Sequence, residues 1–434
     1  MAFLQGLADV VGPTATPEES YRLAHALGQA HRTLGQVEQA RAWHQRQLAL
    51  AKVAGHAEGE AVAHFELAEL ALVHNDYGAA ADAARRGNER ASGAPEQRQP
   101  ALLGRGHRLV GAALAMEGSD LRAAEGHLRS AITARRQADD SANLSAALFE
   151  LGNVLAQQGE IRQAVHYYRE AGAALREGEA PFLHALAENN LAYHSLLLGR
   201  LDDARAALAR GRALAEGHGL SAALLYLFST ESEIHLYTGG WAEAEAASLH
   251  GLALAERCGN TERQAGYRAS LALVAAGRGL HQAAREQLEL ALGMIAGGTY
   301  WHLRTRLLLW LGELSLDLPS GAGAYLETAI ALARAQRRRL IQLQAERLQA
   351  LTLAGRDAAA AQAWLVEQLD HAAALDLSLE VARSRAALAR VTLQHAPRSA
   401  SGRALLERAL SELVAHGAEA EAAALRAAGP LPAR

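Results

Sequence analysis

Residues 143–180 carry apolar side chains at the spacing of two amphipathic α-helices. The apolar face of the first helix consists of Leu144, Leu148, Leu151, Val154 and Leu155. The apolar face of the second helix consists of Ile161, Ala164, Val165, Tyr168, Ala171 and Leu175. Gly159 lies between them, where glycine can take the left-handed conformation of a helix end without steric cost. The pattern predicts a helix pair that turns at Gly159, followed by a new helix with Pro181 in its first turn.

The same helix pair recurs along most of the chain. Its signature is a turn glycine, a nearby apolar residue and an alanine three residues after that, as in residues 198–204. We follow this alanine through Ala40, Ala80, Ala124, Ala164, Ala204, Ala244, Ala283, Ala324 and Ala360. The spacing gives a repeat of about 40 residues. Neither helix of a pair can bury its apolar face alone, so we expect successive pairs to stack on one another.

The small residues of these copies resemble those of the tetratricopeptide repeat family. That family has small residues at three positions of a helix–turn–helix unit. Copies in this chain match with Gly152, Ala164 and Ala171, with Ala192, Ala204 and Gly211, and with Ser232, Ala244 and Gly251. The longer repeat is similar to the variety found in spindle-orientation adaptors, in kinesin light chains and in the helical arms of bacterial transcription regulators.

The resemblance implies an all-α fold. It would be an α-solenoid, wound as a right-handed superhelix of about nine to ten helix–turn–helix repeats with C-terminal capping helices. We expect residues 1–19 to form an N-terminal lead-in, with a short helix over Phe3–Val11. Residues 20–374 would form the repeat array, and residues 375–434 an atypical repeat and the capping helices.

The resemblance also implies that the first helices of the pairs line a concave groove, which binds another protein or a peptide segment. Carried onto this chain, the groove positions are Arg105, Arg108, Phe149, Asn153, Asn189, Asn190, Tyr193, Tyr226, Ser229, Glu233, Tyr237, Arg268, Arg306 and Trp310, with Glu313 at the same offset.

Two groups within this set have chemistry that suits a peptide. Asn153, Asn189 and Asn190 place amides on the groove face, and an amide can both donate to and accept from a peptide backbone. Asparagine is also a poor helix former, so its place within a helix has two interpretations, a contact with a ligand or a solvated helix face. Arg105 and Arg108 lie on one helix face and could fork onto a carboxylate, unless they are solvated or paired locally.

Charge and hydropathy argue against several classes of partner. The formal net charge is −4 over 434 residues, which provides no attraction for a polyanion. The basic run at Arg334, Arg337, Arg338 and Arg339 has no interleaved aromatic residues, so we expect a solvated helix face and no nucleic-acid partner. No uncharged apolar stretch reaches the length of about 18 residues that a membrane helix needs, and the start of the chain lacks a basic signal region. We expect a cytoplasmic protein with no membrane contact.

The spacing of potential catalytic and ligating residues predicts neither an active site nor a metal site. The 19 histidines include no HExxH pattern, and no GxSxG motif or Gly-rich phosphate loop is present. Cys258 is the only cysteine, and we expect it to be a small buried residue near a turn. The chain is therefore predicted to be no enzyme, with no cofactor and no metal.

These observations favour a non-catalytic scaffold that binds a protein or a peptide in its concave groove. The alternative is a regulatory protein that senses a small molecule or a peptide, resembling the helical-repeat arms of bacterial transcription and quorum-sensing regulators. A third possibility is a homo-oligomer, formed through the alanine-rich terminal helices.

Overall fold

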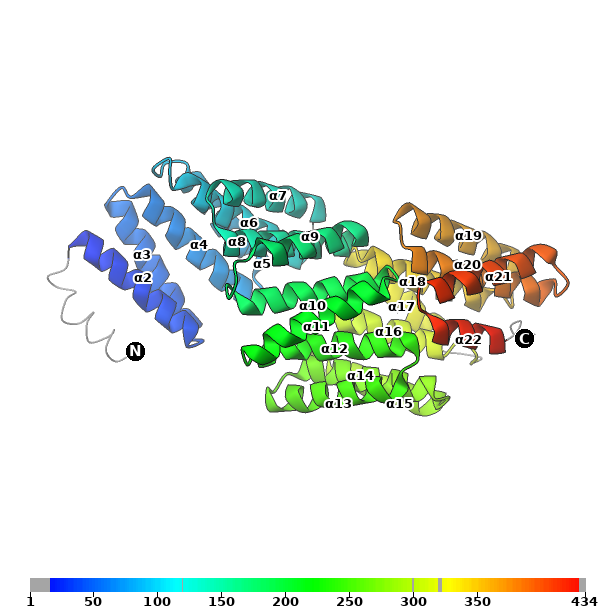
Figure 1. Ribbon diagram of the computed structural model, residues 1–434. Coiled ribbons are helices and arrows are strands. Elements are labelled where there is room, and N and C mark those ends of the chain that lie inside the picture. The colour runs from blue at the N-terminus through cyan, green and yellow to red at the C-terminus, as the bar shows by residue number, and fades with distance from the viewer. Residues whose placement is uncertain (1–15, 119, 299, 319–321, 429–434) are drawn as a thin grey trace. The chain divides into compact units, whose positions relative to one another are not determined.

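The computed structural model describes residues 16–118, 120–298, 300–318 and 322–428, which form 21 α-helices and no strand within these ranges (Figure 1). The chain is therefore all-α, as predicted. The short helix predicted over Phe3–Val11 lies outside the described residues. The first described helix begins at Pro17, before the predicted start of the repeats at residue 20, because Thr16 caps its N-terminus with a hydrogen bond to the Glu19 N–H.

The helices occur in pairs along the chain, with even-numbered helices first in each pair. The earlier helices are α2 (Pro17–Thr33), α3 (Val37–Val53), α4 (Ala57–Val73), α5 (Tyr77–Ala91), α6 (Gln99–Glu117), α7 (Leu121–Gln137), α8 (Ser141–Gln158), α9 (Ile161–Ala174), α10 (Pro181–Leu197) and α11 (Leu201–Gly217). The later helices are α12 (Ser221–Thr238), α13 (Trp241–Arg257), α14 (Thr261–Gly277), α15 (His281–Met294), α16 (Trp301–Leu314), α17 (Ala322–Ala335), α18 (Arg339–Leu353), α19 (Ala358–Ala374), α20 (Ser378–His395), α21 (Ala400–Ala415) and α22 (Glu419–Ala428). The predicted turn at Gly159 is confirmed, with a φ of +88°, and Pro181 begins α10 as predicted.

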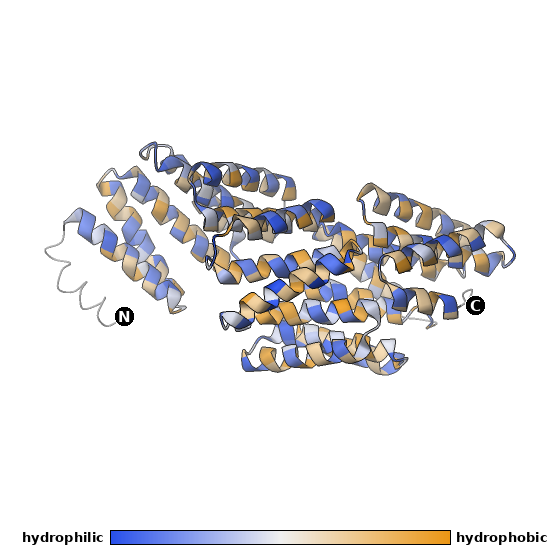
Figure 2. Cartoon of the chain, in the orientation of Figure 1, coloured by the Kyte–Doolittle hydropathy of each residue, from blue (hydrophilic) through white to orange (hydrophobic). Residues whose placement is uncertain are grey.

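The chain divides into two units. Unit 1 comprises residues 1–154 and 173–177, and unit 2 comprises residues 155–172 and 178–434. Each unit is built from helix pairs stacked in chain order. Every helix carries both apolar and polar residues, as an amphipathic helix does (Figure 2). None of the described helices combines the length and the apolar character needed to cross a membrane.

A buried alanine is the fourth residue of the second helix in most pairs. The predicted alanines from Ala40 to Ala244 are all 0% exposed. In α15 and α19, by contrast, Ala283 and Ala360 are exposed, and the following residues Ala284 and Ala361 are buried. The repeat spacing selected the wrong alanine there, because Ala283 and Ala360 are the third residues of their helices and not the fourth, and one residue rotates a helical position by about 100°. Ala324 is also exposed, since α17 buries other positions.

The C-terminal helices of unit 2 pack onto the turns of its earlier repeats. His416 lies against Gly199, where an added Cβ would be 2.4 Å from the His416 Nδ1. Tyr237 donates a hydrogen bond to the His416 carbonyl oxygen at 2.9 Å, and α22 packs against α12. The helices predicted to cap the array therefore also tie distant parts of unit 2 together.

Cys258 is exposed, so the prediction of a buried cysteine was wrong. The residue caps the C-terminal end of α13, directly before the turn at Gly259. The last buried residues of α13 are Leu254 and Ala255, and Glu256, Arg257 and Cys258 after them are all exposed.

Candidate functional site

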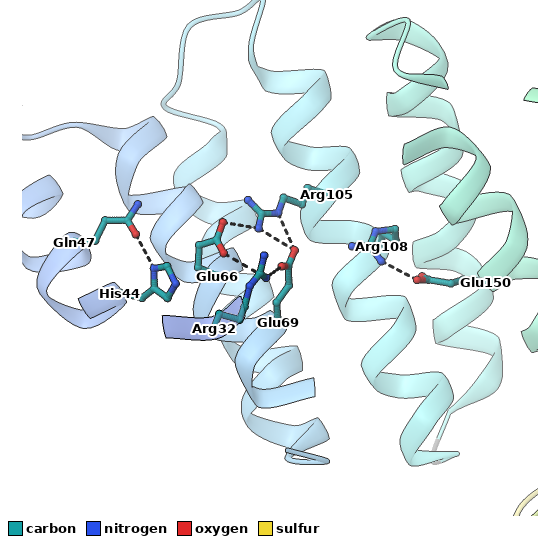
Figure 3. A network of polar contacts seen from close by, with 8 residues as sticks. All are labelled: Arg32, His44, Gln47, Glu66, Glu69, Arg105, Arg108 and Glu150. Carbon is teal, nitrogen blue, oxygen red and sulfur yellow. Dashed lines mark hydrogen bonds and ion pairs between the residues drawn. The ribbon is translucent and has the colours of Figure 1, made fainter. Parts of the chain in front are cut away.

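Arg105 and Arg108 of α6 form ion pairs with glutamates of unit 1 itself (Figure 3). The Arg105 Nη2 atom lies 2.8 Å from both Glu66 Oε1 and Glu69 Oε1 on α4. The Arg108 Nη1 atom lies 2.7 Å from Glu150 Oε1 on α8. The structure thus shows the local pairing that was one of the two interpretations of these arginines. A ligand carboxylate would have to displace a glutamate to reach Arg105.

This network alternates in charge from one first helix to the next. Arg32 of α2 also contacts Glu66 and Glu69, so two arginines hold each of these carboxylates (Figure 3). The Glu66 side chain is only 3% exposed. Burial opposes the ionisation of Glu69, but Arg105 and Arg32 outweigh it and hold the Glu69 pKa below its usual range. The cluster is electrically balanced, which suits a structural role across the repeats.

Phe149 and Asn153, the remaining predicted groove residues of unit 1, lie on α8. Both side chains are half-buried. Gly152, between Phe149 and Asn153 on the same helix, is buried as the resemblance implies.

Seven of the predicted groove residues line one pocket of unit 2, between α10, α12, α14 and α16. They are Asn189, Tyr193, Tyr226, Ser229, Glu233, Arg306 and Trp310. The pocket has a volume of about 170 Å³. Aromatic rings, amide, hydroxyl, carboxylate and guanidinium groups are all present in its wall. Side chains from four repeats therefore converge on one concave site, although they are far apart in the sequence.

Arg306 connects three of the helices around this pocket. Its Nη2 atom lies 3.0 Å from Glu233 Oε2, so α16 reaches α12 past the intervening α14. Its guanidinium also lies 4.6 Å from the centre of the Trp310 ring and 5.8 Å from that of Tyr193 on α10. Burial disfavours the charged form of Arg306, but the Glu233 charge outweighs it and raises the Arg306 pKa. The ion pair thus holds its charge inside the pocket.

Asn189 is buried and has its amide engaged. Its side-chain oxygen accepts a hydrogen bond from the Thr230 hydroxyl of α12 at 2.9 Å, and its Nδ2 donates to Asn190 Oδ1 at 3.2 Å. The amide therefore orients the pocket wall between α10 and α12. Tyr193 and Tyr226 provide the ring surfaces next to it, and Tyr226 remains 37% exposed.

The other predicted residues of unit 2 lie outside this pocket lining. Asn190 accepts from Asn189, and Arg268 forms an ion pair with Glu256 at 3.4 Å. Tyr237 is 8% exposed and bonded to the α21–α22 turn, which gives it a structural role. Glu313 lines a separate pocket of about 250 Å³, together with residues of α18, α20, α21 and α22.

The pattern of the first helices did not identify several residues of the pocket. On α14 the pocket contains Arg263, Gly266, Tyr267 and Ser270. The groove position predicted for this helix from the repeat was Arg268, which does not line the pocket. These four residues follow the i, i+3, i+4, i+7 spacing of one helix face, and that spacing could have found them. His302, Thr230, Glu262 and Leu303 also line the pocket, and no sequence signal marked them. Among the described residues, no group of three His, Cys, Asp or Glu side chains could hold a metal ion.

Comparison with known proteins identifies the fold. No protein-family model matches the sequence, and no curated protein matches it. A solved Rap protein complexed with Competence and Sporulation Factor matches with a TM-score of 0.63 at 11% identity, over 85% of this chain and 100% of that chain. The chain shares its fold with Rap proteins. The Rap conjugation gene regulator of the plasmid pLS20, in complex with the Phr* peptide, matches with a TM-score of 0.55 at 11% identity, over 85% of this chain and 97% of that chain.

These matches confirm the predicted all-α helical-repeat fold. At 11% identity the likeness to the Rap structures concerns the fold. The assignment of individual binding residues therefore depends on the pocket in unit 2.

Proposed function

We propose that the chain is a cytoplasmic, non-catalytic regulatory scaffold that binds a peptide segment in the pocket of unit 2. One observation carries the proposal: groove residues predicted on α10, α12 and α16 converge on a single concave site. The site combines ring surfaces with amide, hydroxyl and charged groups. A peptide offers matching chemistry, because its backbone both donates and accepts hydrogen bonds and its side chains can pack on the rings.

The size of the pocket favours a peptide over a small molecule. Sites that enclose drug-sized ligands typically have about 300–1,000 Å³, whereas this pocket has about 170 Å³. It can take one or two side chains of a longer ligand whose remaining residues lie outside it. The alternative of a small-molecule sensor has no comparable support in the pocket.

Solved proteins with the same fold support a peptide ligand. One of the Rap structures is complexed with Competence and Sporulation Factor, and the other holds the Phr* peptide. We infer by analogy that this fold can present a peptide-binding surface in the present chain as well.

Peptide titration of the whole chain tests the proposal. Libraries of short peptides would be titrated into wild type, with tryptophan fluorescence as the readout because Trp310 lines the pocket. Tyr226→Ala removes an exposed ring of the pocket and should weaken binding about tenfold or more. Phe182→Ala is the matched control, since Phe182 lies on α10 outside the pocket lining and is 42% exposed.

Each outcome bears on the proposal. Weaker binding by Tyr226→Ala with unchanged binding by Phe182→Ala would support it. If both variants bound the peptide as tightly as wild type, the assignment of the binding site to this pocket would be wrong. Thermal stabilisation by a metabolite, with no peptide bound, would favour the small-molecule sensor instead.

A further inference from the structure

Three arginines lie near His302, which lines the pocket of unit 2. Arg338 Nη1 lies 2.8 Å from His302 Nδ1, and Arg263 and Arg306 line the pocket together with His302. The His302 pKa lies well below its usual range, because desolvation disfavours its charged form and the three guanidinium groups repel a further positive charge. The His302 side chain still has an exposed surface. The positive field at this residue is therefore accessible to a ligand.

Arg338 has no carboxylate partner within ion-pair distance among the described residues. It is half-buried, and its hydrogen bonds go to neutral groups, Gln336 Oε1 at 3.0 Å and His302. Burial lowers the Arg338 pKa, which means that its charge is held at an energetic cost. An anion bound beside it would offset that cost.

Arg263 likewise has no carboxylate partner at ion-pair distance in the described part of the chain. Its guanidinium lies 4.0 Å from the centre of the Tyr226 ring, and a ring face attracts a cation without neutralising it. Glu262 lines the same pocket but forms no ion pair with Arg263. Arg306 is already paired to Glu233. Two unpaired cations therefore remain, Arg263 in the described pocket lining and Arg338 next to His302, against the unpaired carboxylate of Glu262.

The hydrogen bond between Arg338 and His302 also fixes where the histidine proton lies. A guanidinium has donors only, so the His302 Nδ1 atom must act as the acceptor. A neutral imidazole then carries its hydrogen on Nε2. His302 therefore adds a hydrogen-bond donor to the two unpaired guanidinium groups.

We infer that Arg263 and His302 of the pocket lining, together with Arg338, which is hydrogen-bonded to His302, bind a carboxylate of the peptide ligand. This inference rests on the proposed peptide-binding function. The carboxylate is either the C-terminus of the peptide or the side chain of an aspartate or glutamate, since both present the same planar anion to a guanidinium. The cluster formed by Arg32, Arg105 and Arg108 in unit 1 gives no such site, because its arginines contact glutamates of the chain itself.

The test uses peptide pools that differ only in charge. Pools with aspartate or glutamate at each position in turn are compared with pools that have asparagine or glutamine there. Each pool is made with a free and with an amidated C-terminus, and all are titrated into the full chain at low and high salt. We expect pools that keep the required carboxylate to bind about tenfold or more tightly than their neutral counterparts, with a smaller difference at high salt.

Variants at neighbouring arginines locate the effect. Arg338→Gln should abolish the preference for the carboxylate, and Arg338→Lys should keep part of it. Arg337→Gln is the matched control, because it removes the same charge from an exposed side chain one residue away. Thermal melting of each variant shows whether the fold is intact.

The results distinguish this inference from the proposed function. Loss of binding on amidation would assign the carboxylate to the peptide C-terminus, and loss on aspartate-to-asparagine exchange would assign it to a side chain. Equal affinity for acidic and neutral pools, or an unchanged preference in a folded Arg338→Gln variant, would overturn the inference while leaving peptide binding intact. Failure of every pool to bind would count against peptide binding itself.

Discussion

Replacing Gly251 with alanine should destabilise unit 2, although alanine is normally the better helix residue. Gly251 lies in the middle of α13, and an alanine Cβ there would be 2.0 Å from Tyr267 Cζ and 2.5 Å from its hydroxyl oxygen. Tyr267 on α14 is 1% exposed and donates a hydrogen bond to the Leu225 carbonyl of α12. The ring cannot move away without giving up its packing or this bond.

The magnitude follows from opposing contributions. Alanine gains about 1 kcal/mol over glycine in a helix interior. Forcing a buried side chain out of position costs about 1–3 kcal/mol, and leaving the Tyr267 hydroxyl or its acceptor unpaired costs about 1–3 kcal/mol more. We therefore expect Gly251→Ala to lower the free energy of unfolding by about 1–5 kcal/mol.

Urea denaturation followed by tryptophan fluorescence measures this change, because Trp241, Trp310 and Trp364 all lie in unit 2. Gly293→Ala in α15 of the same unit is the control. No side chain or distant backbone atom lies within 4 Å of a Cβ built there, so the variant should be unchanged or more stable by up to about 1 kcal/mol. Equal midpoints for wild type and Gly251→Ala would refute the steric argument.

Three further perturbations address unit 2. Tyr237→Phe removes the hydrogen bond to the α21–α22 turn and should cost about 1 kcal/mol in urea denaturation; an unchanged midpoint would mean that this bond adds no stability. Burial opposes the ionisation of Glu380, but Arg347 and Arg383 outweigh it and hold the Glu380 pKa below its usual range. This lowered pKa stabilises the folded state fully at pH values above the pKa of the carboxyl in the unfolded chain, and the stabilisation is lost as the pH falls through the folded-state pKa. Glu380→Gln should therefore make the stability less dependent on pH on the acid side. It should also cost about 3 kcal/mol at neutral pH. A wild-type acid profile in that variant would contradict this account. Burial lowers the pKa of His194 to about 4 from 6.5, so its neutral form is favoured in the folded state. His194 should therefore lower the stability by on the order of 3 kcal/mol as the pH drops from 6.5 towards 4. His194→Gln should remove this part of the slope in a denaturation series across the pH range, while histidines such as His302 keep theirs; a slope as steep as that of wild type would contradict the account.

Secondary structure and turns could be predicted from the sequence because they depend on neighbouring residues. The helical period of the apolar residues located the pairs, and glycine conformation located turns such as Gly159 and Gly199. The spacing failed by one residue at Ala283 and Ala360, which are exposed, whereas the next residues, Ala284 and Ala361, are buried. The helical period therefore locates a helix more reliably than it identifies which of its residues are buried.

The pocket could be predicted only in part, because its members come from different repeats. The repeat offsets placed Tyr193, Glu233 and Arg306 on the groove side, and all three line the pocket. The offsets could not show that Arg306 of α16 would reach Glu233 of α12, since that depends on how tightly successive pairs curve. Nor did they separate Tyr237, whose hydroxyl is bonded to the C-terminal helices, from the residues of the pocket.

The sequence by itself determined that this chain is a series of amphipathic helix pairs which must stack to bury their apolar faces. Only the tertiary structure decided which charges neutralise one another. In the sequence, Arg105 had two interpretations, a carboxylate-binding residue or a locally paired one, and the structure shows that it is paired with glutamates of α4. Arg338 looked like part of a solvated basic run, yet it lies half-buried against His302 without a carboxylate partner among the described residues. The reason is physical: an ion pair depends on distance in space, and stacking brings together side chains from separate repeats that no local pattern relates.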